Sequence, residues 1–171
     1  MIETDILYVH PFGEQVYSSE NFFLSDTSIE LKDHNSPKYY SYIPMGLIGT
    51  LNNVIAKGYT VRGVNLPFKK AILGTEMDYL KEFSAKVVLI DLHWYVHMKN
   101  GLEVAKFCKS FLPRAKVIVG GMTATIFAQQ LVKYDCVDYV ILGDSEKPFS
   151  LLIENILGGK KNKVPNLVSK E

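Results

Sequence analysis

The stretch "AKVVLIDLHW", residues 85–94, decides the fold. Its Val, Leu and Ile residues follow one another almost without interruption and then give way to Asp91, His93 and Trp94. A strand that is apolar on both faces is typical of a parallel sheet covered by helices on both sides. The stretches "AKVIVGG" (115–121) and "DYVILGD" (138–144) have the same character. Together the three predict neighbouring strands of one buried sheet.

Two further strands are predicted by "DILYVH" (5–10) and "YTVRGVNLPF" (59–68). Amphipathic stretches predict helices over residues 44–58, 76–85, 101–113, 123–135 and 147–159. Strands that alternate with helices through short connections indicate an open α/β sheet. We therefore expect a three-layer, doubly wound, flavodoxin-like (Rossmann-like) α/β fold with a five-stranded parallel sheet.

Composition predicts a soluble globular protein. The chain has 171 residues, of which 47% are apolar and 22% charged, and a net charge of +1. That charge provides no electrostatic footprint for nucleic acid or an anionic membrane. No apolar run reaches the roughly 20 residues of a membrane helix, and the start of the chain does not resemble a signal peptide. Cys108 and Cys136 belong to no CxxC pattern, so they predict buried thiols in a cytoplasmic protein, and this chain lacks the cysteines of an iron–sulfur site.

The predicted domain covers residues 1–159, and residues 160–171 are a linker or tail with a short strand at most. One connection is unusually long. Residues 11–43 form a polar insert between the first strand and the first helix. A connection this long inside a compact domain is usually either a functional loop or a disordered one. This insert follows the carboxyl end of a strand, the edge at which open α/β sheets bind ligands.

Unusual residues are concentrated at that same edge. The first strand ends at His10, and the third strand leads into Asp91, His93 and Trp94. The fourth is followed by Gly120, Gly121, Met122 and Thr123, and the fifth by Gly143, Asp144 and Glu146. Because the carboxyl ends of parallel strands line a common crevice, we expect these residues to form one site.

The two adjacent glycines, Gly120 and Gly121, have two interpretations. Without side chains they let a flat or bulky ligand approach the backbone, and Thr123 then offers a hydroxyl and a helix N-cap. A tight turn with a capping threonine accounts for the same residues.

His93 and His97 are four residues apart, a spacing that aligns two metal ligands on a helix. The segment crosses a strand end, however, and no third ligand stands at a recognisable spacing. Histidines satisfied by backbone partners are the other interpretation.

A phosphoryl receiver domain is a second candidate class. Asp91, Thr123 and Lys147-Pro148 stand where a receiver has its acceptor, its hydroxyl and its Lys-Pro pair. A receiver also needs an acidic pair after the first strand to hold Mg²⁺, whereas this chain has "YVHPFG" there.

Four short motifs carry a family resemblance. "PMGL" (44–47), the Gly-Gly pair (120–121), "GDSE" (143–146) and "VPNLV" (164–168) occur in order. In this order they resemble the N-terminal cobalamin (B12)-binding domain of B12-binding radical SAM proteins. The resemblance covers nearly the whole chain except residues 11–43.

The resemblance implies that the cofactor is cobalamin, with the corrin ring over the strand ends and its nucleotide tail near the Gly-Gly turn. It implies a radical SAM barrel as the partner, and S-adenosylmethionine and a [4Fe-4S] cluster belong to that barrel. The implied cofactor-binding residues are His10, Pro44, Met45, Gly46, Leu47, Asp91, His93, Trp94, Gly120, Gly121, Met122, Thr123, Gly143, Asp144 and Glu146. No catalysis is expected from this chain alone.

Some relatives hold cobalt with the histidine of an Asp-x-His-x-x-Gly motif after the first strand. Here Asp91-Leu92-His93 matches its first half after the third strand, and Val96 replaces the glycine. His93 is therefore a candidate cobalt ligand that the motif does not assign. A domain whose cofactor pocket is vestigial, with a structural or interaction role, is the alternative.

Overall fold

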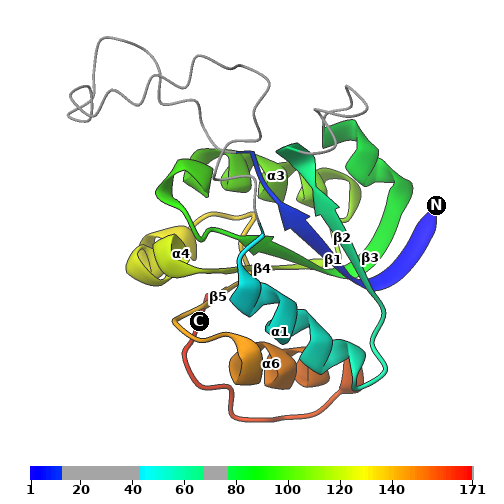
Figure 1. Cartoon of the computed structure of the whole chain (residues 1–171), viewed down its shortest axis with the longest axis vertical. Helices are drawn as coiled ribbons and strands as arrows, with labels where there is room; N and C mark the ends of the chain where they lie inside the picture. The colour runs from blue at the N-terminus through cyan, green and yellow to red at the C-terminus, as the bar shows by residue number, and fades with distance from the viewer. Residues whose placement is uncertain (13–42, 68–76, 171) are drawn as a thin grey trace.

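The computed structural model describes residues 1–12, 43–67 and 77–170, so nearly all of the predicted insert lies outside the described residues. A six-stranded sheet with the order β2-β1-β3-β4-β5-β6 forms the middle layer (Figure 1). The strands are β1 (Ile2–His10), β2 (Val61–Asn65), β3 (Phe83–Asp91), β4 (Lys116–Gly120), β5 (Tyr139–Ile141) and β6 (Leu167–Ser169).

The first five strands are parallel, as the sequence predicts, and the predicted fold class is confirmed. The sheet has one strand more than expected. β6 comes from the predicted tail and pairs antiparallel with β5, with Val168 opposite Val140. After α6 the chain runs back to the carboxyl end of β5, where Leu142 N donates to Asn166 O at 2.9 Å, so β6 starts at that end and runs antiparallel.

Helices cover both faces of the sheet. They are α1 (Met45–Ile55), α3 (Met98–Phe111), α4 (Met122–Ile126), α5 (Ala128–Leu131) and α6 (Glu146–Gly158), with the 3₁₀ helices η2 (Met77–Glu82) and η3 (Tyr95–His97). α1 and α6 lie side by side on one face, and α3 and α4 lie on the other (Figure 1). No helix of the described ranges has both the length and the apolar character that a membrane span requires.

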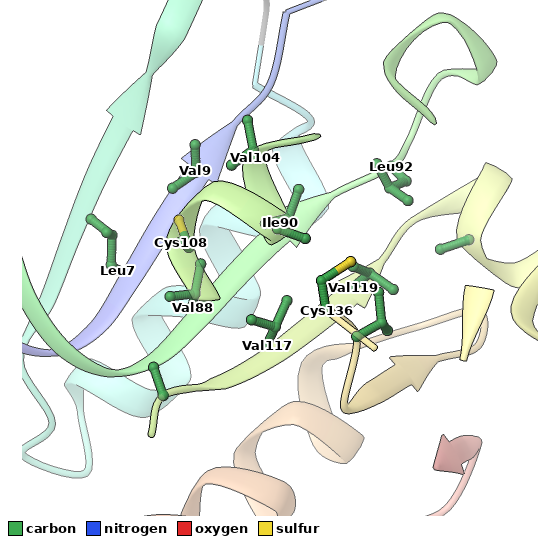
Figure 2. Packing of buried hydrophobic residues seen from close by; sticks show 14 of the residues in the cluster. Leu7, Val9, Val88, Ile90, Leu92, Val104, Cys108, Val117, Val119 and Cys136 are labelled. Atoms are coloured by element: carbon green, nitrogen blue, oxygen red, sulfur yellow. The ribbon is translucent and has the colours of Figure 1, made fainter. Parts of the chain in front are cut away.

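Each face of the sheet has its own core, because successive strand residues point to opposite faces. Leu7, Val9, Val88 and Ile90 pack with Val104 and Cys108 of α3 (Figure 2). Ile6, Tyr8 and Leu89 pack with α1 and α6 on the other face. Cys108 and Cys136 are free and buried, as predicted, and burial raises the pKa of the Cys108 thiol to about 12.

Local structure differs from the sequence prediction in three places. The helix predicted over residues 76–85 is a 3₁₀ helix that ends before Phe83, because Phe83 begins β3 and is 4% exposed in the core. The helix predicted over residues 123–135 is interrupted at Phe127, whose backbone (φ −107°, ψ 21°) is not helical. The second strand ends at Asn65 instead of Phe68.

Asp138 joins β4 to the loop before β5. Its Oδ2 accepts a hydrogen bond from the Val117 N–H at 2.7 Å and lies 2.7 Å from Lys109 Nζ. Lys116 Nζ lies 3.5 Å from Oδ1. Burial opposes ionisation of this carboxyl, but the two lysines and the N–H outweigh that effect and lower the pKa of Asp138.

We expect Asp138→Asn to lower the free energy of unfolding by about 1–2 kcal/mol at pH 7, the contribution of hydrogen bonds to a charged group. Because the pKa of Asp138 is lowered on folding, its contribution is present above the unfolded-state pKa and is lost as pH falls through the folded-state pKa. Urea denaturation of both proteins at pH 7 and pH 3 should show the difference shrinking in acid. Asp135→Asn, at an exposed ion pair with Lys170, is the matched control and should change little.

Candidate functional site

The carboxyl ends of β1 and β3 meet at the centre of the sheet. The chain leaves β1 for β2 on one side and reaches β3 on the other, so the strand order reverses between them. Such a switch point is where open α/β sheets bind ligands. Val9 pairs with Ile90, which places His10 beside Asp91 as both strands end. The sequence predicted both residues for one site, and the structure brings them together.

His10 and Asp91 belong to a buried polar cluster. Tyr8 Oη donates a hydrogen bond to Asp91 Oδ1 at 2.8 Å, and His10 Nδ1 lies 2.9 Å from the same oxygen and 3.1 Å from Oδ2. The His97 ring meets the His10 ring edge-on, with centroids 4.8 Å apart. Burial, followed by the charge of Asp91, raises the pKa of Tyr8, so Tyr8 remains a neutral donor.

The Gly-Gly turn packs directly on the loop that follows β3. Gly121 has φ +109°, and a Cβ there would lie 2.7 Å from His93 N and 2.8 Å from Leu92 C. Thr123 N donates to Leu92 O at 3.0 Å, and Thr123 Oγ1 donates to His93 O at 3.3 Å. The predicted capping role of Thr123 is therefore wrong: the N-cap position is Gly121, and the Thr123 hydroxyl holds the neighbouring loop.

The loop after β5 touches the same turn and the start of α1. Gly143 N donates to Thr125 Oγ1 at 2.9 Å, and Gly143 has φ +61° with nothing within 4 Å of an added Cβ. Thr50 Oγ1 of α1 lies 2.8 Å from Ser145 Oγ. Contacts thus connect α1, the loop after β5, the Gly-Gly turn and the loop after β3. The predicted motifs form one continuous edge.

The "PMGL" motif, residues 44–47, begins α1 at this edge. Pro44 is the N-cap residue, and Met45 is 79% exposed. An added Cβ on Gly46 would meet nothing within 4 Å, whereas one on Gly49 would lie 2.6 Å from the Glu146 carboxylate. Leu47 packs against the core shared by α1 and α6. The motif therefore joins a packed helix face to an open, apolar end.

Several apolar side chains at the edge are exposed. Trp94 is 36% exposed and Met122 54%, and Tyr95 and Ile126 are more exposed still. The His93 ring meets the Trp94 ring edge-on at 4.7 Å. Gly120 lies two residues after Ile118, so both point to the face of the sheet that α1 and α6 cover. A Cβ at Gly120 would meet only Ile141 O, at 4.0 Å. The exposed side chains form an apolar rim at this edge of the sheet.

Two surface hollows, of about 460 and 480 Å³, contain none of the predicted site residues. The first is lined by residues such as Tyr139 and Asn162, and the second by Lys106, Lys133 and Tyr134. The arrangement of glycines, hydroxyls and exposed apolar side chains at the carboxyl edge defines the candidate site more specifically than either hollow.

Fold and edge together define a ligand-binding, doubly wound α/β domain with a glycine-lined switch-point site. A family model of the B12 binding domain matches residues 52–153, well over half of the chain. The chain therefore belongs to the B12-binding domain family, and the family resemblance and the cofactor class expected from the sequence are confirmed.

The chain spans only about a quarter of the length of the relatives it matches. Hopanoid C-3 methylase of Methylococcus capsulatus is 26% identical over 147 residues, which cover 80% of this chain and 28% of the methylase. The radical S-adenosylmethionine methyltransferase TsrM of Kitasatospora setae, with cobalamin and a [4Fe-4S] cluster bound, has a TM-score of 0.68 at 18% identity, covering 98% of this chain and 27% of its own. OxsB, a cobalamin-dependent S-adenosylmethionine radical enzyme, has a TM-score of 0.60 at 12% identity, and the match covers 96% of this chain and 20% of OxsB.

Proposed function

We propose that the carboxyl edge of the sheet binds cobalamin, and that the chain is the cobalamin-binding module of a radical SAM enzyme. Residues 1–159 form most of the module, β6 of the 160–171 tail completes its sheet, and this tail leads toward a barrel domain that holds S-adenosylmethionine and the [4Fe-4S] cluster. The observation that carries the proposal is the chain of contacts that unites the family motifs at one edge. The match to the B12-binding family supports it.

The residues at the edge fit a corrin ring. A corrin is a broad, flat macrocycle with amide side chains, and the exposed indole of Trp94 and the side chains of Met45 and Met122 offer apolar surface of matching character. His93, beside the indole, and the exposed Asp144 and Glu146 offer polar partners for the amides. His10 and Asp91 form the buried floor of this site.

The nucleotide tail is proposed to pass beside Gly120, on the face covered by α1 and α6. A Cβ at Gly120 would meet only Ile141 O, at 4.0 Å, so the absence of a side chain there lets a ligand approach the backbone. The hydroxyls of Thr50 and Ser145 lie where α1 meets α6 and offer polar partners at the mouth of this path. Gly121 and Gly143, in the turns after β4 and β5, complete the rim of this path.

When bound, cobalamin supplies cobalt-centred chemistry, and the protein supplies binding and orientation. Thr123 and Gly121 hold the loop that carries His93 and Trp94 at the corrin side of the edge. The buried free thiols and absent disulfides among the described residues fit a cytoplasmic location, which we include in the proposal.

The phosphoryl receiver is not favoured. Asp91, the residue that would accept phosphate, is 4% exposed, and Tyr8 and His10 occupy its carboxylate. A vestigial pocket with a structural role is the alternative that the following experiment separates from cofactor binding.

Purified protein mixed with hydroxocobalamin or methylcobalamin and then desalted is expected to retain the corrin absorption bands. The position of the bands will report whether a histidine ligates cobalt. A colourless protein, in this chain and in the longer protein that contains it, would contradict the proposal and favour the vestigial pocket.

We expect His93→Ala to weaken cobalamin binding by about 3–10-fold, the loss of one polar partner. Trp94→Ala should weaken it at least as much, because the indole provides flat apolar contact area. Spectroscopic titration measures both. The matched control is Tyr134→Ala, an exposed aromatic residue away from the edge, which should bind as the unmodified protein does. Unchanged affinity in His93→Ala would remove His93 from the site.

A further inference from the structure

We propose that His10, Asp91 and His97 bind a divalent transition-metal ion of the zinc class beneath the cobalamin edge. One ligand atom from each of the three side chains lies within 4.8 Å of the others. The three come from separate elements: the end of β1, the end of β3 and η3. Such convergence of two imidazoles and a carboxylate is the kind of donor set that zinc and its first-row neighbours prefer.

Burial strengthens the case for an ion. His10 and His97 are completely buried and Asp91 is 4% exposed. A buried carboxylate needs compensation by charge or by hydrogen bonds, and Tyr8 and His10 provide hydrogen-bonding contacts to Asp91. A divalent cation between the three groups supplies the charge as well.

The local geometry assigns roles to individual atoms. Asp91 Oδ1 accepts the Tyr8 hydroxyl, which leaves Oδ2 as the oxygen ligand. Oδ2 lies 3.1 Å from His10 Nδ1. Ligands bound to zinc at about 2.0–2.1 Å in a tetrahedral site lie about 3.3–3.4 Å apart, so this pair is already close to that separation. His97 stands farther away, and binding draws it inward. Tyr8 is the outer-shell partner that orients the carboxylate.

The ion would have a structural role distinct from that of cobalamin. Residues 92–96, which include His93 and Trp94, lie between two of its ligands, Asp91 and His97. Metal binding would fix both ends of this loop. The three ligands are buried within the domain, so the site suits a bare ion. The cobalt of cobalamin is held in a broad corrin ring, which is too large to enter a buried site of this kind.

The test begins with the protein stripped of metal by EDTA, dialysed and titrated with Co²⁺, followed by Zn²⁺ competition. We expect a visible Co²⁺ band that saturates at one ion per chain and disappears when Zn²⁺ is added. His97→Ala and Asp91→Asn should weaken Co²⁺ binding by more than about 100-fold, and Tyr8→Phe by about 10-fold, as outer-shell substitutions do. Asp135→Asn, at an exposed aspartate outside the cluster, is the control and should bind Co²⁺ normally.

Absence of a stoichiometric Co²⁺ band in the unmodified protein would overturn the proposal, whatever the variants do. Equal Co²⁺ affinity in folded His97→Ala would overturn it as well. Circular dichroism establishes whether each variant is folded, and if His97→Ala is not, His97→Gln replaces it. Cobalamin retention is measured separately on the EDTA-treated protein, so failure of the metal site and failure of cobalamin binding remain distinguishable.

Discussion

Replacing Asp91 by alanine is expected to lower the free energy of unfolding by about 2–6 kcal/mol, because each of its two buried hydrogen-bonding partners then loses the carboxylate at a cost of about 1–3 kcal/mol. The Asp91 carboxylate accepts from Tyr8 Oη at 2.8 Å and lies 2.9 Å from His10 Nδ1. Both partners are buried, so neither gains a water molecule easily when the carboxylate is gone. Two polar groups are then left inside the domain, each with a desolvation penalty.

Urea denaturation in EDTA measures this loss without any contribution from a bound metal. Asp144→Ala, at an exposed aspartate of the same sheet edge, is the matched control and should change stability by less than about 0.5 kcal/mol. Tyr8→Phe removes one hydrogen bond only and should cost about 1 kcal/mol. If Asp91→Ala were as stable as Asp144→Ala, the cluster would not stabilise the centre of the sheet.

The sheet could be predicted because burial on both faces is visible in the sequence. The strands that contain Val87–Ile90 and Val117–Val119 are almost wholly apolar, and both are buried in the structure. The sixth strand was harder to recognise. Leu167–Ser169 is short and half-exposed, and its pairing with β5 depends on where the chain returns after α6. The break at Phe127 and the short η2 helix likewise depend on tertiary packing, because their sequences match a helical period.

The candidate site was predicted in outline but not in its contacts. The rule that parallel strands end at one edge was sufficient to bring His10 and Asp91 together. It did not identify Tyr8, which looks like a core residue until the strand register places its hydroxyl beside Asp91. His97 was considered only with His93, whereas the structure pairs its ring with His10. The contribution of residues 13–42 lies outside the described residues.

The second large effect is expected at the Gly-Gly turn. Gly121→Ala should lower the free energy of unfolding by about 3 kcal/mol, since unfavourable backbone conformation and overpacking each cost about 1–3 kcal/mol. The backbone there has φ +109°, which side-chain-bearing residues rarely adopt, and the new Cβ would lie 2.7 Å from His93 N. The atoms it meets are backbone atoms, so no side-chain rotation relieves the contact, and the loop that carries His93 and Trp94 must move.

Gly143→Ala separates the two causes. Gly143 also has a positive φ, +61°, but its added Cβ meets nothing within 4 Å, so only the conformational cost of about 1–2 kcal/mol applies. Chemical denaturation of both variants gives the difference, and cobalamin titration shows whether displacement of the loop also weakens binding. Equal stability of the two variants would mean that the turn does not press on the loop after β3. A larger loss in Gly121→Ala, together with weaker cobalamin binding, would establish that this contact positions the corrin-facing loop.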